Sequence, residues 1–314
     1  MEGPARCLLQ CVDASSEYCP CYLAESGDCI VCSLLTGADF CECSWSGSCI
    51  YLNYRFNQGT IYKRQEEVVF AEKNEIAPGL FDFQFQLGAQ WLPALSQAGA
   101  LLFVRPLTAP DLAAVPISVV DIKNSKIRLV VSSVGPKTRL LAQAKAELVI
   151  RGPYFSGLIN NHKLTQLHNT KVVFVAGGVG QSPLILAAKT LLRGENHIWA
   201  CLAPGVAGMV YVRKDLEALG VTVQEVTSLR LQGMLIVKHW LTEIKPVLLV
   251  VAGPEGLQTA CRELIQDIRQ KGHQIDLVTT QNAVMCCGEG LCGSCLGHEF
   301  KQKRVPLCKA QYLL

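Results

Sequence analysis

Four cysteines toward the end of the chain have the spacing of an iron–sulfur site. Cys287, Cys292 and Cys295 form a C-x4-C-x2-C run, and Cys308 follows from outside it. Plant-type [2Fe–2S] clusters use this spacing, because three thiolates on a tight loop and a fourth from elsewhere surround two irons. Glycines between these cysteines let the loop turn sharply and bring backbone amides close to the sulfurs. The segment therefore predicts a [2Fe–2S] cluster with these four ligands.

Zinc is the alternative occupant of this C-terminal site, because four cysteines also bind zinc tetrahedrally. Zinc ribbons usually carry two C-x2-C pairs, whereas this segment has one pair beside a glycine-rich gap. The spacing favours the iron–sulfur cluster. Cys286, next to the first ligand, is not expected to be a ligand itself.

Nine of the sixteen cysteines lie near the N-terminus. In a reducing cytosol such density favours metal ligation over disulfides. Two C-x-C pairs and one C-x2-C pair predict at least one [4Fe–4S] cluster, and a structural zinc site is the alternative, since the spacing matches neither metal's known runs. The expected ligands are Cys7, Cys11, Cys19, Cys21, Cys29, Cys32, Cys41, Cys43 and Cys49.

A glycine-rich turn follows the apolar run 172–176 and precedes a predicted helix. Glycines let a backbone approach a pyrophosphate, and a helix N-terminus offers unpaired amides to its charge. Such a turn alone is often only a tight connection, but a second glycine loop ends a later strand, where ligands of parallel sheets bind. The residues expected to contact a nicotinamide nucleotide are Gly177, Gly178, Gly180, Pro183, Gly253 and Pro254.

Two stretches of the chain, with different patterns of predicted secondary structure, lie between the two groups of cysteines. Short strand-like segments at 67–72, 81–87, 101–104, 117–122, 127–132 and 147–150 are typical of an antiparallel β-barrel. Alternating strands (171–176, 197–202, 221–226, 247–252) and helices (182–192, 212–219, 234–243, 257–271) then predict a doubly wound α/β sheet. The expected domains are a Cys-rich block 1–58, a barrel 59–165, a nucleotide-binding α/β domain 166–283 and a cluster-binding segment 284–314.

The composition excludes several other classes of protein. A net charge of +3 without a basic stripe argues against nucleic-acid binding. The apolar runs are too short to cross a bilayer, and the first residues lack the pattern of a secretory signal. We therefore expect a cytoplasmic protein with no membrane insertion.

The combination of motifs resembles one family. A barrel followed by GGVGQSP, AGPEG and MCCGEGLCGSC is similar to the dihydroorotate dehydrogenase electron-transfer subunit, within the ferredoxin–NADP reductase superfamily. Relatives include the small subunit of NADH-dependent ferredoxin:NADP oxidoreductase and sulfide dehydrogenase. The resemblance covers roughly residues 60–314, and it implies FAD in the barrel and NAD or NADP on the α/β domain.

The family's FAD motifs are only partly kept. Its Arg-Pro-aromatic/aliphatic-Ser stretch matches residues 115–118, where Val115 replaces the arginine that pairs with flavin phosphate. Arg105, in the preceding loop, is the candidate substitute for that charge. The resemblance implies FAD contacts from Pro116, Ile117, Ser118, Thr138 and Gly152. The alternative is a barrel that has lost its flavin and only supports clusters.

A loop that is acidic in the family carries Arg230 here. Losing acidic groups and gaining an arginine suits the extra phosphate of NADP, and Arg213 or Lys214 could serve the same purpose. NADP is therefore favoured over NAD.

The resemblance implies an electron-transfer flavoprotein subunit of a heteromeric oxidoreductase. It would pass electrons between NAD(P)H, FAD and iron–sulfur clusters, to or from a partner subunit, with ferredoxin among the candidate partners. The N-terminal block favours, by analogy, an electron-bifurcating transhydrogenase. The alternative is a non-catalytic iron–sulfur scaffold or redox-sensing subunit. No catalytic acid or base is expected, because the cofactors carry the chemistry.

Overall fold

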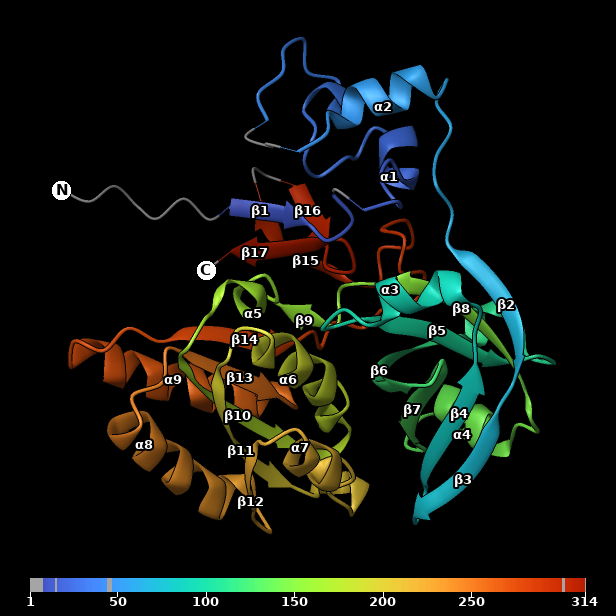
Figure 1. Ribbon diagram of the computed structural model, residues 1–314. Coiled ribbons are helices and arrows are strands. Elements are labelled where there is room, and N and C mark those ends of the chain that lie inside the picture. The colour runs from blue at the N-terminus through green and yellow to red at the C-terminus, as the bar shows by residue number, and fades with distance from the viewer. Residues whose placement is uncertain (1–7, 15, 44–46, 301–302, 314) are drawn as a thin grey trace.

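The fold is taken from a computed structural model that describes residues 8–14, 16–43, 47–300 and 303–313. A seven-stranded antiparallel sheet has the order β2-β8-β5-β6-β7-β4-β3. Its two edge strands follow one another in the chain with only Ala71 between them, so the sheet curls into a barrel (Figure 1). The strands are β2 (Gln65–Phe70), β3 (Glu72–Ala77), β4 (Leu80–Gln86), β5 (Leu101–Pro106), β6 (Val115–Lys123), β7 (Lys126–Ser132) and β8 (Glu147–Tyr154).

Alternate strand residues fill the barrel with a core that includes Phe83, Phe85, Leu102, Leu129 and Ile150. Strand side chains alternate between faces, so this pattern of short strands buries one face and leaves the other in water. Two helices flank the barrel, α3 (Leu92–Leu95) and α4 (Pro136–Gln143).

The second sheet has the order β12-β11-β10-β13-β14-β9, with five parallel strands and antiparallel β9 at one edge. Its strands are β9 (Leu158–Ile159), β10 (Lys171–Gly177), β11 (His197–Ala203), β12 (Thr222–Glu225), β13 (Leu248–Ala252) and β14 (Asp276–Thr280). The helices are α5 (Lys163–Gln166), α6 (Leu184–Leu192), α7 (Arg213–Ala218), α8 (Met234–Glu243) and α9 (Glu255–Gln270). Separate apolar clusters cover the two faces, so the central strands are apolar along their whole length.

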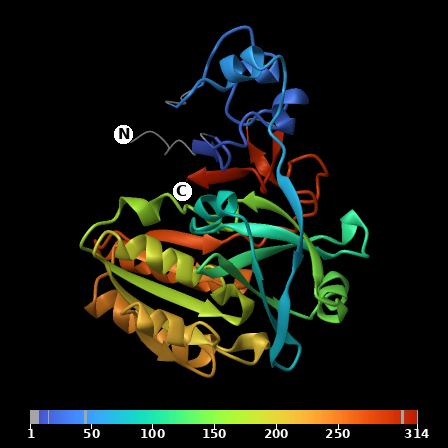
Figure 2. The same cartoon turned by 45° about the vertical axis from the view of Figure 1, so that its right-hand side comes forward.

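The two ends of the chain meet in a third layer. β1 (Leu8–Cys11) pairs antiparallel with β17 (Ala310–Leu313), beside the hairpin of β15 (Leu296–Phe300) and β16 (Lys303–Pro306). The rest of the N-terminal block, with α1 (Tyr22–Glu25) and α2 (Ile50–Phe56), lies above these C-terminal strands in both views (Figures 1 and 2).

The structure differs from the expected elements in several places. The single strand predicted at 67–72 is two strands, because the chain changes partner from β8 to β4 at Ala71. Helix α4 and strand β14 were not predicted. The helix expected from residue 182 begins at Leu184, after the short 3₁₀ turn Gly178–Gln181. Among the described residues no helix is long and apolar enough to span a membrane.

Candidate functional site: a nucleotide pocket leading to a cysteine loop

A pocket of about 1090 Å³ lies where the carboxyl edge of the parallel sheet faces the barrel. It is lined by the glycine turn after β10, the loop after β13, strand β6, the end of β14 at Thr280, and residues 281–283 and Met285 beyond it. The predicted site residues that it brings together are Pro116, Ser118, Gly177, Gly178, Gly180, Pro183, Arg230, Gly253 and Pro254.

The glycine turn is shaped by close backbone approach. Gly178 has a φ of +61°, a conformation that disfavours other residues. A Cβ on Gly180 would lie 2.5 Å from the carbonyl oxygen of Ala252 and 2.8 Å from the amide of Gly253. The turn after β10 and the loop after β13 therefore touch at Gly180, although they are far apart in sequence.

Replacing Gly180 with alanine should weaken nucleotide binding while the barrel stays intact. The added methyl group meets backbone atoms that cannot rotate away, and overpacking of this kind costs about 1–3 kcal/mol. We expect the KM for the reduced nucleotide to rise roughly 5- to 150-fold. Gly256→Ala is the matched control, because Gly256 lines the same pocket and its Cβ would meet nothing within 4 Å. Equal KM values for the two variants would contradict the assignment.

Arg230 is the one charged residue in the pocket lining within the described part of the chain. It sits in the π-helical turn Leu229–Gly233, and its side chain is exposed. Arg213, by contrast, pairs with Glu217 at 2.8 Å and Glu225 at 3.3 Å. Of these two arginines, Arg230 is therefore the one placed for an anionic group of a ligand in the pocket.

Some of the residues expected to contact the flavin line the pocket, and the others lie outside it. Pro116 and Ser118 line the pocket, whereas Ile117 packs in the barrel core. Thr138 caps α4, since its hydroxyl accepts a hydrogen bond from the amide of Gly135 at 3.0 Å. Gly152 lies outside the lining, and a Cβ there would meet Leu102 at 2.7 Å.

Arg105 is engaged away from this pocket. Its guanidinium pairs with Asp111 at 2.8 Å and Glu66 at 3.3 Å, and it donates a hydrogen bond to the carbonyl of Ala109 at 2.9 Å. Arg105 is therefore paired with acidic side chains and lies outside the lining of the pocket.

The C-terminal cysteine loop has the backbone that a cluster needs. Its glycines Gly288, Gly290 and Gly293 have φ of +73°, +82° and +73°. The amide of Glu289 donates to Cys287 Sγ at 3.3 Å, and the amide of Cys308 donates to Cys295 Sγ at 3.4 Å. Amide donors of this kind stabilise thiolate ligands.

The thiols of this loop lie close enough to exchange hydrogen bonds. Hydrogen bonding from the Cys308 thiol, and then from backbone amides, lowers the pKa of Cys287 to about 4. The same thiol lowers the pKa of Cys295 to about 6. Cys292 is exposed and also contacts Cys287. The donor set and backbone fit a [2Fe–2S] cluster, with three ligands on the loop and Cys308 from outside it.

The pocket between the barrel and the parallel sheet extends to the start of this cysteine loop. Ala283 and Met285 line the pocket and lie just before Cys287 in the chain. Arg151, on barrel strand β8, donates a hydrogen bond to the carbonyl of Cys287 at 3.0 Å. The buried Nε of Arg151 has no partner among the described residues. Barrel, pocket and cysteine loop are thus in direct contact.

A buried ion network that the sequence did not reveal contacts the cysteine loop at Glu289. Lys309 Nζ contacts Asp13 at 2.6 Å and Glu289 at 3.0 Å. Arg64 contacts Asp13 at 2.5 Å and lies over the rings of Tyr18 and Tyr154. The side chains of Asp13, Arg64 and Lys309 are at most 1% exposed.

The network binds the two ends of the chain to the barrel. Burial alone would lower the pKa of Lys309, but the carboxylates of Asp13 and Glu289 raise it well above its usual range. Tyr154 donates to Glu289 at 2.8 Å. The sequence gives no sign that these charged residues are buried, because their neighbours in the chain form no pattern that indicates burial.

The N-terminal cysteines form two groups in the described part of the chain. Cys11, Cys19, Cys21 and Cys29 line a small internal cavity. Cys41 and Cys43 have sulfurs 3.4 Å apart at the surface. Cys32 is buried, Cys49 is exposed, and Cys7 lies outside the described residues. No three described His, Cys, Asp or Glu side chains converge on one point as a single metal ion would require.

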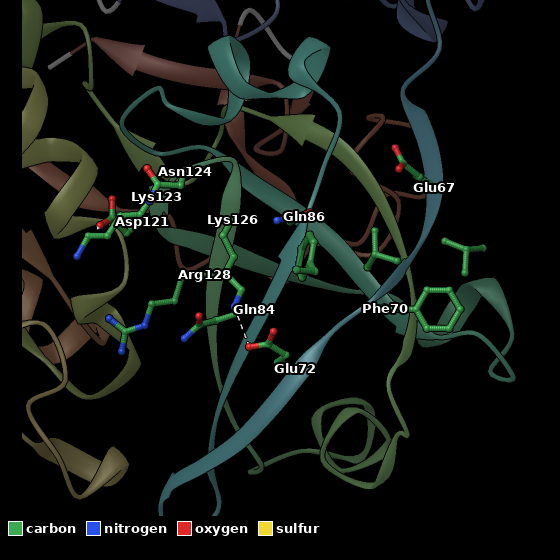
Figure 3. Close-up of a pocket in the computed structure, with 13 residues that line it drawn as sticks. Glu67, Phe70, Glu72, Gln84, Gln86, Asp121, Lys123, Asn124, Lys126 and Arg128 are labelled. Atoms are coloured by element: carbon green, nitrogen blue, oxygen red, sulfur yellow. Dashed lines mark hydrogen bonds and ion pairs between the residues drawn. The ribbon is translucent and has the colours of Figure 1, made fainter.

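A second pocket, of about 910 Å³, lies on the barrel and contains none of the predicted site residues. Its wall mixes charges of both signs, including the ion pair between Lys126 and Glu72 at 2.7 Å (Figure 3). Asp121, on this wall, is paired with Lys189 from α6. These pairs hold the barrel strands together and to the α/β domain.

Comparisons with known proteins bear out the resemblance in the sequence. No family model matches the chain. The probable dihydroorotate dehydrogenase B (NAD(+)) electron transfer subunit of Methanopyrus kandleri is 28% identical over 179 residues, which are 55% of this chain and 64% of the relative. The corresponding subunit of Clostridium perfringens is 25% identical over 58% of this chain and 71% of its own length.

Two solved structures share the fold. An NADH-dependent reduced ferredoxin-NADP oxidoreductase matches with a TM-score of 0.56 and 21% identity, over 81% of this chain and 89% of its own. The ferredoxin reductase of carbazole 1,9a-dioxygenase matches with a TM-score of 0.51 and 12% identity, over 68% of each chain. The chain is thus similar in sequence to the electron transfer subunits of dihydroorotate dehydrogenase B, and it has a ferredoxin-reductase-like fold.

Proposed function

We propose that this protein is the NAD(P)H-dependent flavoprotein subunit of a heteromeric oxidoreductase, and that it transfers electrons through iron–sulfur clusters. One observation carries the proposal: a single pocket joins the nucleotide turn, barrel strand β6 and the segment that leads to Cys287. A nicotinamide nucleotide and an FAD that share this pocket would have their reactive rings beside the cysteine loop.

FAD suits the barrel side of the pocket. Leu101, Pro116 and Ser118 present an apolar wall with one hydroxyl, typical of the mix that orients a large cofactor. When bound, FAD supplies the chemistry that links two-electron transfer from NAD(P)H to one-electron transfer at clusters. The chain's own part is to hold the nucleotide at Gly177–Gly180 and Gly253–Pro254 and to bring the cysteine loop close.

The finer assignments belong to the same proposal. Residues 59–165 bind FAD, residues 166–283 bind the nucleotide, residues 284–314 carry the [2Fe–2S] cluster and residues 1–58 hold further metal. The protein works in the cytoplasm, with other subunits at the far end of the electron path and ferredoxin as a candidate. The similarity in fold to the NADH-dependent reduced ferredoxin-NADP oxidoreductase, whose structure bears on flavin-based electron bifurcation, supports an electron-bifurcating transhydrogenase.

The test is the visible spectrum of the anaerobically purified protein during titration with NADPH and then NADH. We expect flavin bands that bleach on addition of nucleotide, over a broader cluster absorbance. Cluster absorbance without flavin would overturn the proposal and support the non-catalytic scaffold, for which Val115 and the engaged Arg105 already provide an argument.

Arg230→Ala should separate NADPH from NADH. Hydrogen bonds to charged groups contribute about 1.5–3 kcal/mol, so the KM for NADPH should rise roughly 10- to 150-fold. The KM for NADH should change little, because NADH lacks the extra phosphate. Arg213→Ala is the control, since Arg213 is already paired with two glutamates. Equal effects of Arg230→Ala on both nucleotides would refute the NADP assignment.

A further inference from the structure

The internal cavity of the N-terminal block combines four thiols with an apolar wall. The thiols belong to Cys11, Cys19, Cys21 and Cys29. Apart from these and Asp13, the wall is apolar and includes Leu23 and Ile50. The carboxylate of Asp13 is already paired with Lys309 and Arg64. The thiols are therefore the polar groups left to bind something inside the cavity.

The arrangement of these thiols fits a multi-iron cluster better than a single ion. Zinc needs four sulfurs at about 2.3 Å from one point. No three metal-ligating side chains converge in this way in the described chain. The four thiols instead line one small internal cavity, and four cysteine thiolates are the usual ligand set of a [4Fe–4S] cluster.

One of these sulfurs already has the hydrogen bond of a thiolate ligand. The amide of Cys32 donates to Cys29 Sγ at 3.4 Å. The same type of amide-to-sulfur bond is made to Cys287 and Cys295 in the C-terminal loop. Amide donors to sulfur stabilise the charge of a cluster and tune its potential.

The cavity lies against the C-terminal cysteine loop. Leu23 lines the cavity, and a Cβ on Gly290 would lie 2.9 Å from the Cδ2 atom of Leu23. Asp13, also on the cavity wall, reaches Lys309, the residue after Cys308. Leu23 and the Asp13–Lys309 ion pair therefore connect the wall of this cavity to the C-terminal cysteine segment.

We propose that Cys11, Cys19, Cys21 and Cys29 hold one [4Fe–4S] cluster, placed next to the C-terminal cluster site across Leu23. The proposal rests on the proposed function, because it makes this cluster the neighbour of the [2Fe–2S] centre. The surface pair Cys41 and Cys43 is not part of it. Electrons would pass between this cluster in the N-terminal block and the C-terminal [2Fe–2S] cluster.

The test compares metal content and magnetic resonance of the full-length protein with those of Cys19→Ala and Cys29→Ser, all purified anaerobically. We expect each variant to lose about four irons and four sulfides per chain. In the dithionite-reduced wild type, the two neighbouring clusters should broaden each other's paramagnetic signals. In the variants, a sharp signal of the C-terminal cluster should remain. Its presence would show that the variants are folded.

Two controls make the result specific. Cys261→Ala removes a buried thiol of the α/β domain and should leave the iron content unchanged. Cys41→Ala should keep the magnetic interaction. Zinc in place of iron, unchanged iron in the Cys19 and Cys29 variants, or loss of the interaction in Cys41→Ala would each overturn the site. The proposed function fails separately, if NADPH bleaches no flavin in the wild type.

Discussion

Cys292→Ala should abolish the paramagnetic signal of the C-terminal cluster and remove about two irons per chain. Removing a residue that only supports a metal ligand already lowers metal affinity by about 10- to 100-fold. Removing a ligand itself should therefore lower the affinity for the cluster by more than about 100-fold. Cys292 suits the test because its side chain is exposed, so that its replacement removes little packing. Iron and sulfide analysis and magnetic resonance after dithionite reduction measure the effect.

The neighbouring Cys286→Ala is the matched control for this experiment. Cys286 lies beside the first predicted ligand but outside the C-x4-C-x2-C run. We expect its iron content and signal to equal those of the wild type. NADPH should still bleach the flavin in both variants, because neither residue lines the nucleotide pocket. A full cluster signal in Cys292→Ala would rule out the predicted ligand set.

The second large effect concerns the stability of the fold. Lys309→Met should lower the free energy of unfolding by about 3–5 kcal/mol, because it removes one of the two buried cations beside Asp13 and Glu289 and leaves only Arg64 to balance both carboxylates. Lys309 is fully buried and contacts these carboxylates at 2.6 and 3.0 Å. Denaturant unfolding of the anaerobic protein, followed by circular dichroism, measures the change.

Lys163→Met is the matched control for Lys309→Met. Lys163 makes a partly exposed ion pair with Asp276 at 3.1 Å, and such pairs contribute about 0–1 kcal/mol. The double variant Lys309→Met/Asp13→Asn removes one charge of each sign and should recover part of the lost stability. If Lys309→Met is no less stable than Lys163→Met, the network does not hold the two chain ends together.

The sequence alone revealed the features that depend on local spacing. These features are the C-x4-C-x2-C run, the glycine turn after an apolar strand, and the alternation of strands and helices. Each can be recognised from residues close together in the chain, because ligand spacing and side-chain periodicity are local properties. The resemblance added the FAD motif, of which Pro116 and Ser118 line the pocket and Ile117 does not. Strand alternation explains the difference, since neighbours on β6 point to opposite faces.

Only the tertiary structure decided which distant residues meet. The pairing of β1 with β17, the contact of Leu23 with Gly290 and the burial of Asp13 beside Lys309 join the first residues of the chain to the last. No local pattern encodes such contacts, because they depend on how separate elements pack. Likewise, Arg105 and Arg230 look alike in sequence. Packing places acidic partners beside Arg105 and leaves Arg230 on the pocket wall.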